Sequence, residues 1–304
     1  MTITQRRAIA EVLFATSLWG FGFIATVWML PVFDPLLLNA VRFAVTFACA
    51  APFIFYSPRL RKAIDNKQIL LSMGPGFCLG IGLCLQSAGL QYTSVTNSGF
   101  ITCLYVLLVP LMGRIFLGRK IHLIHLGFVA LALAGTAFMV RFQPHQSFSQ
   151  LNRGDLLTFA AAITISAQIL WVDHALPRSR SPFMFNIFSC LWAGIASTFC
   201  MVVAHFILGI PPRFTWHISP ALAFNALIGC LFLVFGSTLL GFTIQMRAQK
   251  VLEPSAAAML FLVESPFAAL YGWIFMAEHL NGTQWLGATL ILIAAGGTIT
   301  FEKL

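Results

Sequence analysis

The chain has 304 residues, of which 59% are hydrophobic and only 9% are charged. Soluble domains are about 45–50% apolar and about 25% charged, so this chain lacks the polar residues that a soluble surface needs. Composition therefore excludes a soluble enzyme, a nucleic-acid-binding domain and a disordered chain, and it indicates a polytopic membrane protein. The net charge of +9 does not indicate nucleic acid as a partner, because the basic residues lie in short clusters between apolar runs.

Ten apolar runs are long enough, at about 20 residues each, to cross a bilayer as helices. In chain order they cover 8–28, 36–57, 70–91, 97–117, 122–141, 155–175, 183–208, 221–246, 255–276 and 283–301. The first run contains Glu11 and lacks a clear cleavage site, so we interpret it as a membrane helix and not as a signal peptide. The short loops leave no room for a soluble domain. We predict an all-α polytopic membrane protein with ten transmembrane helices.

The distribution of Lys and Arg predicts the orientation of these helices. Thirteen of them lie in segments on the same side as the N-terminus, and three, Arg141, Arg153 and Arg213, lie in loops on the other side. Because cytoplasmic loops carry the excess of Lys and Arg, both termini are expected in the cytoplasm.

The two halves of the chain resemble each other weakly. Segment 95–118 aligns with segment 251–274, which places Pro110 opposite Pro266 and Leu108 opposite Glu264. Each half holds five predicted spans, an odd number, so the second half enters the membrane upside down. Such inverted repeats are typical of secondary transporters, whose substrate site lies near the midplane between the repeats. A duplicated channel or scaffold is the alternative. The predicted five-helix repeats cover residues 1–147 and 148–304.

Six segments in order carry a family resemblance: LWGFGFI (18–24), PLLLNAVRFAV (35–45), GLQYTSVTNSGFITCLYVLLVP (89–110), GDLLTFAAAITISAQIL (154–170), FTIQMRAQKVLEPSAAAMLF (242–261) and ESPFAALYGWIFMAEHL (264–280). The set resembles the EamA family of the drug/metabolite transporter (DMT) superfamily. This resemblance implies ten helices, an inner-membrane location and export of small metabolites, often amino acids or related compounds. Two positions depart from the family pattern: Pro266 follows Glu264 by two residues instead of one, and Arg119 occupies the first-half position that matches Glu278.

Glu264 is the sharpest candidate for a functional residue. It lies about nine residues into the ninth span, hence about 14 Å deep at 1.5 Å per residue. A charged group at that depth costs at least about 2.5–3.5 kcal/mol, so it must be protonated, paired or in contact with a wet cavity. The carboxyl group could carry a proton through the transport cycle or bind a substrate ammonium. A protonated acid that is hydrogen-bonded to a neighbouring helix is the alternative.

Pro110 and Pro266 lie in the fourth and ninth spans. Each removes a backbone hydrogen bond to the carbonyl four residues earlier, which predicts a helix kink. Paired interruptions in the two halves of an inverted repeat point to the binding site, whereas a packing kink is the alternative.

Polar and aromatic side chains on neighbouring spans are expected to complete a substrate-binding site. They are Gln86, Tyr105, Gln168, Trp171 and Gln245, with Trp19 and Asn39 as weaker choices. Amides can orient a zwitterion, and aromatic rings can pack on an ammonium. Interhelical hydrogen bonds or plain packing are the alternatives for each. Arg42 could bind a substrate carboxylate, but we favour a side chain that extends outward to the membrane surface or caps backbone carbonyls.

The remaining motifs predict no cofactor, no metal site and no catalytic residue. The seven cysteines all lie in apolar runs, which favours packing. His122 and His125 lack further ligands for a metal. The motif Gly76-x-x-x-Gly80 favours close helix packing, within a monomer or in a homodimer.

The leading hypothesis is therefore a secondary-active exporter that works by alternating access, with or without coupling to protons. An importer or exchanger, a drug efflux carrier, and a non-transporting membrane scaffold are the alternatives. An intramembrane enzyme lacks the motifs that it would need.

Overall fold

The computed structural model describes residues 3–62, 64–119, 123–139, 152–215 and 217–301. Within these ranges the chain is helical, and the one contact of strand type is an isolated bridge between Phe33 and Phe214. Eight helices, or helices joined end to end, are long and apolar enough to cross a membrane. They are Thr4–Met29, Pro35–Tyr56, Val95–Leu117, Arg153–Arg178, Pro182–Ile207, Pro220–Ala248, Pro254–Met276 and Gly282–Thr300. The predicted all-α membrane class is confirmed.

Two of the ten predicted spans form shorter helices. The run 70–91 is divided between α4 (Asn66–Leu71) and α5 (Met73–Gly89), and the run 122–141 contains α8 (Leu123–Met139). A helix of 17 residues, the length of α5 and of α8, measures about 25 Å at 1.5 Å per residue, slightly less than a hydrocarbon core of about 30 Å. The boundary predicted between the repeats, at residues 147 and 148, lies outside the described residues.

Several helices begin where a capping side chain precedes a proline. The Oδ1 atom of Asp34 accepts hydrogen bonds from the backbone N–H groups of Leu36 and Leu37, at 3.0 and 3.1 Å, at the start of α2 (Pro35–Tyr56). Ser181 and Ser219 act in the same way for α10 (Pro182–Leu208) and α11 (Pro220–Leu231). A capping oxygen and a proline at the first helical position both favour a helix start, which is why the sequence predicts these starts well.

The fourth and ninth predicted spans are each broken into two helices. The first break separates α6 (Val95–Thr102) from α7 (Tyr105–Leu117), and the second separates α13 (Pro254–Phe261) from α14 (Glu264–Met276). Both spans have eight residues before the break and 13 after it. Both end in a left-handed residue, Gly118 with φ 64° and Ala277 with φ 54°.

These matching lengths change the register of the internal alignment. The helix bounds place Tyr105 opposite Glu264, whereas the sequence alignment places Leu108 there. Pro266 lies in the first turn of α14, directly after the break, and removes the N–H that would bond to the Leu262 carbonyl. Pro110 lies inside α7, well after the break at Cys103 and Leu104. The two prolines therefore do not occupy equivalent points.

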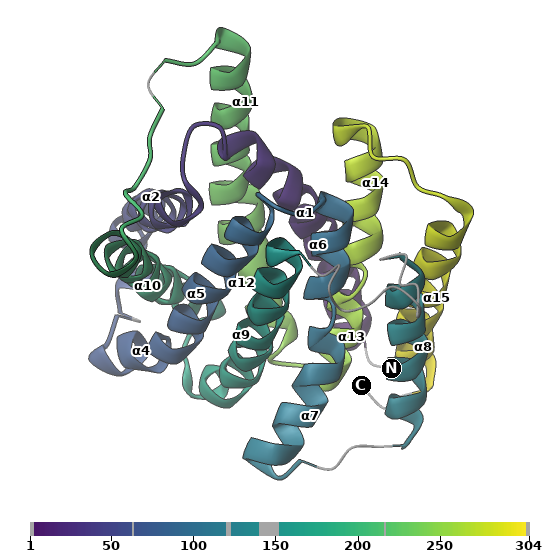
Figure 1. The fold of residues 1–304 in the computed structure, drawn as a ribbon. Coiled ribbons are helices and arrows are strands. Elements are labelled where there is room, and N and C mark those ends of the chain that lie inside the picture. Colours follow the sequence, from purple (N-terminus) through teal and green to yellow (C-terminus); the bar gives the residue numbers. More distant parts are fainter. Residues whose placement is uncertain (1–2, 63, 120–122, 140–151, 216, 302–304) are drawn as a thin grey trace.

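The bundle is organised around α1 (Ile3–Met29), which packs against α14, α11, the π-helix η3 (Phe232–Gly241) and α12 (Phe242–Ala248). The helix α5 packs against α9 (Arg153–Ala175) and α10, and α8 and α15 (Gly282–Phe301) form a pair at one edge (Figure 1). α3 (Pro58–Arg61) and the 3-10 turn Leu176–Arg178 are short connections.

The small-residue motif in α5 explains its close approach to α10. A Cβ atom on Gly76 would lie 2.5 Å from the Ser189 carbonyl oxygen, and one on Gly80 would lie 2.5 Å from the Ala193 carbonyl oxygen. The motif therefore serves packing within one chain.

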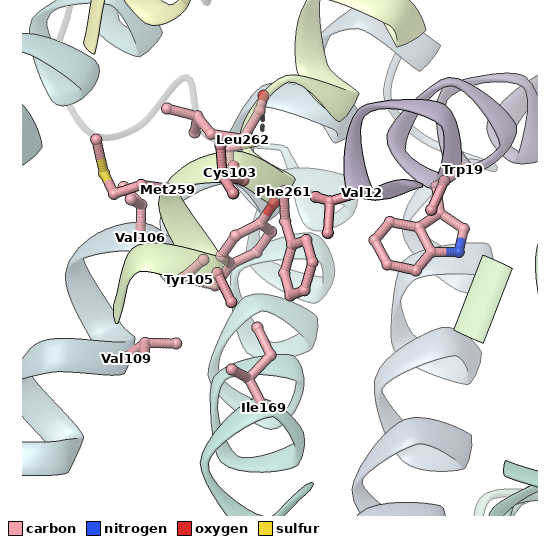
Figure 2. Close-up of a cluster of buried hydrophobic side chains, with 14 of the residues drawn as sticks. Val12, Trp19, Cys103, Tyr105, Val106, Val109, Ile169, Met259, Phe261 and Leu262 are labelled. Carbon is pink, nitrogen blue, oxygen red and sulfur yellow. Dashed lines mark hydrogen bonds between the residues drawn. The ribbon is translucent and has the colours of Figure 1, made fainter. Parts of the chain in front are cut away.

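The largest buried cluster lies where α1, α7, α9 and α13 meet. Figure 2 shows Tyr105 of α7, Ile169 of α9 and Phe261 of α13 close together, with Trp19 of α1 beyond Phe261. The Trp19 and Phe261 rings lie edge to face with centroids 5.4 Å apart. These side chains form one wall of the cavity described next.

Candidate functional site

A cavity of about 60 Å³ lies at the centre of the bundle. At about 10–15 Å³ per water, it holds on the order of four water molecules. Six of the eight predicted binding residues line it: Trp19, Gln86, Tyr105, Gln168, Gln245 and Glu264. Thr26, Arg42, Thr102 and Ser237 add further polar groups, and Phe23, Phe242 and Phe261 are among the apolar ones. The structure thus brings together side chains from both halves of the chain.

Glu264 is the acidic residue of this cavity. It is the first residue of α14, directly after the break in the ninth span. Among the described residues, no hydrogen-bond donor or cation pairs with its carboxylate. A carboxylate with these surroundings is available to a proton or to a cationic group in the cavity.

Arg42 is the basic residue of the cavity, and it does not reach outward to the surface as the sequence favoured. Its side chain is directed inward, and the residue is only 4% exposed. The Nε atom donates to Thr238 Oγ1 at 2.7 Å and the Nη2 atom donates to Ser237 Oγ at 2.9 Å. These hydroxyls, on η3, hold the guanidinium inside the bundle and explain the correction.

The glutamines of the cavity are joined to neighbouring polar groups. Gln86 donates to Thr102 Oγ1 at 3.0 Å, and Gln245 donates to Gln168 Oε1 at 3.1 Å and to Gln249 Oε1 at 2.9 Å. Within the described part of the chain, the Gln168 amide nitrogen and the Tyr105 hydroxyl are buried without a hydrogen-bond partner. Buried polar atoms are normally paired, so these two groups mark places where a bound molecule or water can be held.

Trp171 and Asn39 lie outside the cavity. Trp171 is 48% exposed and packs over Gly74 on the outer surface of the bundle. Asn39 is buried, and its Nδ2 atom donates to the Pro35 and Leu83 carbonyls and to Ser87 Oγ, at 2.9, 3.1 and 2.9 Å. These bonds tie α2 to α5, so the geometry gives Asn39 a structural role.

Polar contacts join helices at both ends of the bundle. At one end, Glu278 accepts hydrogen bonds from the backbone N–H groups of Val95 and Thr96, at 2.9 and 3.1 Å, and from the Thr96 hydroxyl. At the other end, Arg119 pairs with Asp173. There, too, Glu11 pairs with Arg7 at 2.9 Å and with Arg247 at 3.0 Å. The cavity therefore lies between two sets of polar contacts that join helices.

Ser237 and Thr238 were not predicted from the sequence, because both lie in a long apolar run. In the structure they lie in the π-helix η3 and accept hydrogen bonds from Arg42. π-Helical turns are rare in proteins, and those that occur are often found at functional sites. In the described part of the chain, no three His, Cys, Asp or Glu side chains lie close enough to hold a metal ion. His122 lies outside that part.

A bundle of apolar helices that encloses a central cavity with one acid and one base has the architecture of a multi-pass membrane transporter. Comparison with known proteins supports this class. Residues 6–141 and 152–300 match the model of the EamA-like transporter family, and the chain belongs to this family. The family resemblance in the sequence is confirmed, and the chain is a transporter, not an enzyme.

Individual relatives cover most of the chain. It is 30% identical to an "uncharacterized transporter" of Archaeoglobus fulgidus, over 91% of this chain and 80% of the relative. It is 23% identical to a "probable amino-acid metabolite efflux pump" of Escherichia coli, over 90% of this chain and 88% of the relative. A crystal structure with 18% identity covers 97% of both chains with a TM-score of 0.72, which supports the fold.

Proposed function

We propose that the protein is a secondary-active carrier that exports small metabolites, such as amino acids or related compounds, by alternating access. The observation that carries this proposal is the central cavity, which is lined by both Arg42 and Glu264 without an ion pair between them. A polar cavity between two sets of interhelical contacts suits a carrier, which exposes its site to one side at a time. The E. coli relative named as an efflux pump supports the direction and the substrate class.

In this proposal the chain forms ten transmembrane helices as two inverted five-helix repeats, residues 1–147 and 148–304. The equal lengths of the two broken spans support this arrangement. When the two spans are aligned by their helix bounds, the same alignment also matches Gln86 with Gln245. The Cys103 thiol lies 3.8 Å from the Leu262 carbonyl oxygen, so the breaks in the two spans are in contact with each other. The helices α5 and α8 then cross the membrane in spite of their length, which slight local thinning of the bilayer permits.

We propose that the carrier lies in the inner membrane and that both of its termini are in the cytoplasm. The excess of Lys and Arg on one side supports this orientation. The end closed by Arg119, Asp173 and Glu11 is then cytoplasmic, and the end closed by Glu278 is external.

In the proposed transport cycle, the contacts at the two ends of the bundle open in turn. Substrate enters from the cytoplasm while the contacts of Arg119 and Glu11 are open, and it leaves after those contacts form and the contact of Glu278 with α6 breaks. Glu264 is the proposed coupling group, since a proton and a substrate cation compete for one carboxylate. Cys103, Tyr105 and Arg42 are the other titratable or charged groups around it.

Counterflow in proteoliposomes tests the function. Vesicles with the full chain are loaded with one unlabelled amino acid from a panel, and the same labelled compound is added outside at low concentration. We expect saturable, transient accumulation of label for at least one amino acid, because a carrier exchanges substrate across the membrane. Flux without saturation or counterflow would indicate a channel. No flux of any amino acid or cationic drug by the folded protein would favour a scaffold.

A further inference from the structure

Arg42 forms no ion pair within the described part of the chain. The residue is 4% exposed, and hydroxyl groups are the partners of its two side-chain hydrogen bonds. A guanidinium has five N–H donors, so these two bonds leave donors for another group. A buried charge within a membrane is costly unless it is paired, and charged side chains at such depth commonly mark a substrate path. The remaining donors of Arg42 are therefore available to an anionic group.

The guanidinium is also held in a fixed position. Thr238 and Ser237 each accept one of its hydrogen bonds, and the Trp19 indole N–H donates to the Ser237 carbonyl at 3.2 Å. The Arg42 guanidinium lies 5.6 Å from the centre of the Phe43 ring, which adds a cation–π contact. Because a planar guanidinium matches a carboxylate with two parallel hydrogen bonds, a fixed Arg42 suits recognition of a carboxylate.

The same cavity contains an opposite charge. Trp19 lies between the two charged residues. Its indole N–H donates to the carbonyl of Ser237, the residue whose hydroxyl accepts from Arg42. Its ring packs on Phe261, three residues before Glu264. Apolar side chains, including Leu79, Leu83 and Ile165, complete the lining. A purely anionic ligand would be repelled by Glu264 and a purely cationic one by Arg42. A ligand with both charges and an apolar body is complementary to the whole cavity.

We propose that Arg42 binds the carboxylate of a zwitterionic substrate, whose ammonium group faces Glu264 and whose apolar side chain packs against Trp19 and Phe261. This inference rests on the proposed function and deepens it, since it names the substrate class and the residue that selects it. Arg42 is thus a specificity-determining residue, and loss of the substrate carboxylate is expected to weaken binding about ten- to a hundredfold.

Competition with an isosteric ligand series tests this inference in the native chain. The full-length protein in proteoliposomes is assayed for counterflow of labelled L-leucine, and three analogues compete: L-leucinamide, 3-methylbutylamine and 4-methylpentanoate. The first two lack the carboxylate and the third lacks the ammonium. We expect all three to compete at least tenfold more weakly than unlabelled L-leucine. Equal competition by L-leucinamide would overturn the role of Arg42 while leaving a working carrier. Absence of counterflow for leucine and every other amino acid would overturn the proposed function and this inference together.

Substitutions assign the effect to the residue. R42Q removes the charge and R42K keeps it without the planar fork, whereas R61Q removes an exposed arginine of α3 as a matched control. We expect R42Q to raise the KM for L-leucine about ten- to a hundredfold and to abolish the preference for L-leucine over L-leucinamide, with partial recovery in R42K. An unchanged preference in folded R42Q would refute the assignment. If R42Q does not fold, the analogue series is measured in R42K instead. A preference for L-leucine over L-leucinamide in R42K that equals that of the native chain would also refute the assignment to Arg42.

Discussion

Replacement of Glu264 by glutamine is the most informative perturbation of the proposed transport cycle. In the proposed outward step the site carries Arg42, an ionised Glu264 and a zwitterion, which sum to zero net charge. In the return step Glu264 carries a proton and Arg42 keeps its charge, so the site has a net charge of +1. One positive charge therefore moves inward for each substrate exported.

This charge count sets the size of the expected effect. One elementary charge moving through 100 mV corresponds to about 2.3 kcal/mol, which supports a concentration ratio of about 50-fold. Proteoliposomes with a valinomycin-controlled potassium potential of that size measure the ratio directly. We expect the native chain to approach it and Glu264→Gln to give a ratio near one, because the amide cannot take up a proton.

A matched control and a clear refutation are available. Glu253→Gln alters an exposed glutamate at the start of α13 and should leave the accumulation ratio unchanged. Accumulation by Glu264→Gln that still follows the membrane potential would refute the coupling role of this carboxyl group. Accumulation by the native chain that ignores the potential would refute the charge count.

Four further substitutions test the structural roles of individual residues. Gly80→Ala places a Cβ atom 2.5 Å from the Ala193 carbonyl oxygen and should destabilise the protein by about 1–3 kcal/mol. The control Gly127→Ala has open space around the new Cβ atom and should not destabilise the protein; thermal unfolding in nanodiscs compares the two variants. Glu278→Gln weakens charge-assisted bonds to α6 and should lower the same unfolding temperature, and an unchanged value would show that this contact contributes little. Asn39→Ala should cost about 1–2 kcal/mol of stability with little change in KM, because its bonds join helices outside the cavity; a large KM change with normal stability would return it to the binding site. Trp171→Ala should leave counterflow kinetics unchanged, and a raised KM would contradict its placement on the outer surface.

Much of the fold could be predicted because helix starts and membrane length are local properties. Capping residues before prolines mark the starts of α2, α10 and α11, and apolar length marks the long spans. The broken spans were harder to predict. Pro266 marks the second break, but the first break lies at Cys103 and Leu104, where no local residue signals it. At this break the Cys103 thiol contacts the Leu262 carbonyl of the other half of the chain, a partner that local sequence does not reveal.

The candidate site shows the same division. Residue chemistry was sufficient to expect Glu264 and the glutamines beside an internal cavity, because polar groups inside apolar spans are costly unless they have partners or a cavity. It was insufficient for Trp171 and Arg42, since periodicity alone does not reveal which side of a helix faces the bundle interior. Asn39 also resembles a cavity residue in sequence, yet its amide joins α2 to α5.

The membrane class, the helical content and the acid in the ninth span could be read from composition, apolar length and local residue chemistry. The transporter family was indicated by the resemblance of six ordered segments and is confirmed by the family match. Three features required the folded chain: Tyr105 and Glu264 each begin the second helix of a broken span, Ser237 and Thr238 hold Arg42, and one acid and one base face the same cavity. The physical reason is that a side chain's role in a helical bundle depends on helix rotation and on the winding of η3, both of which are set by packing between distant segments.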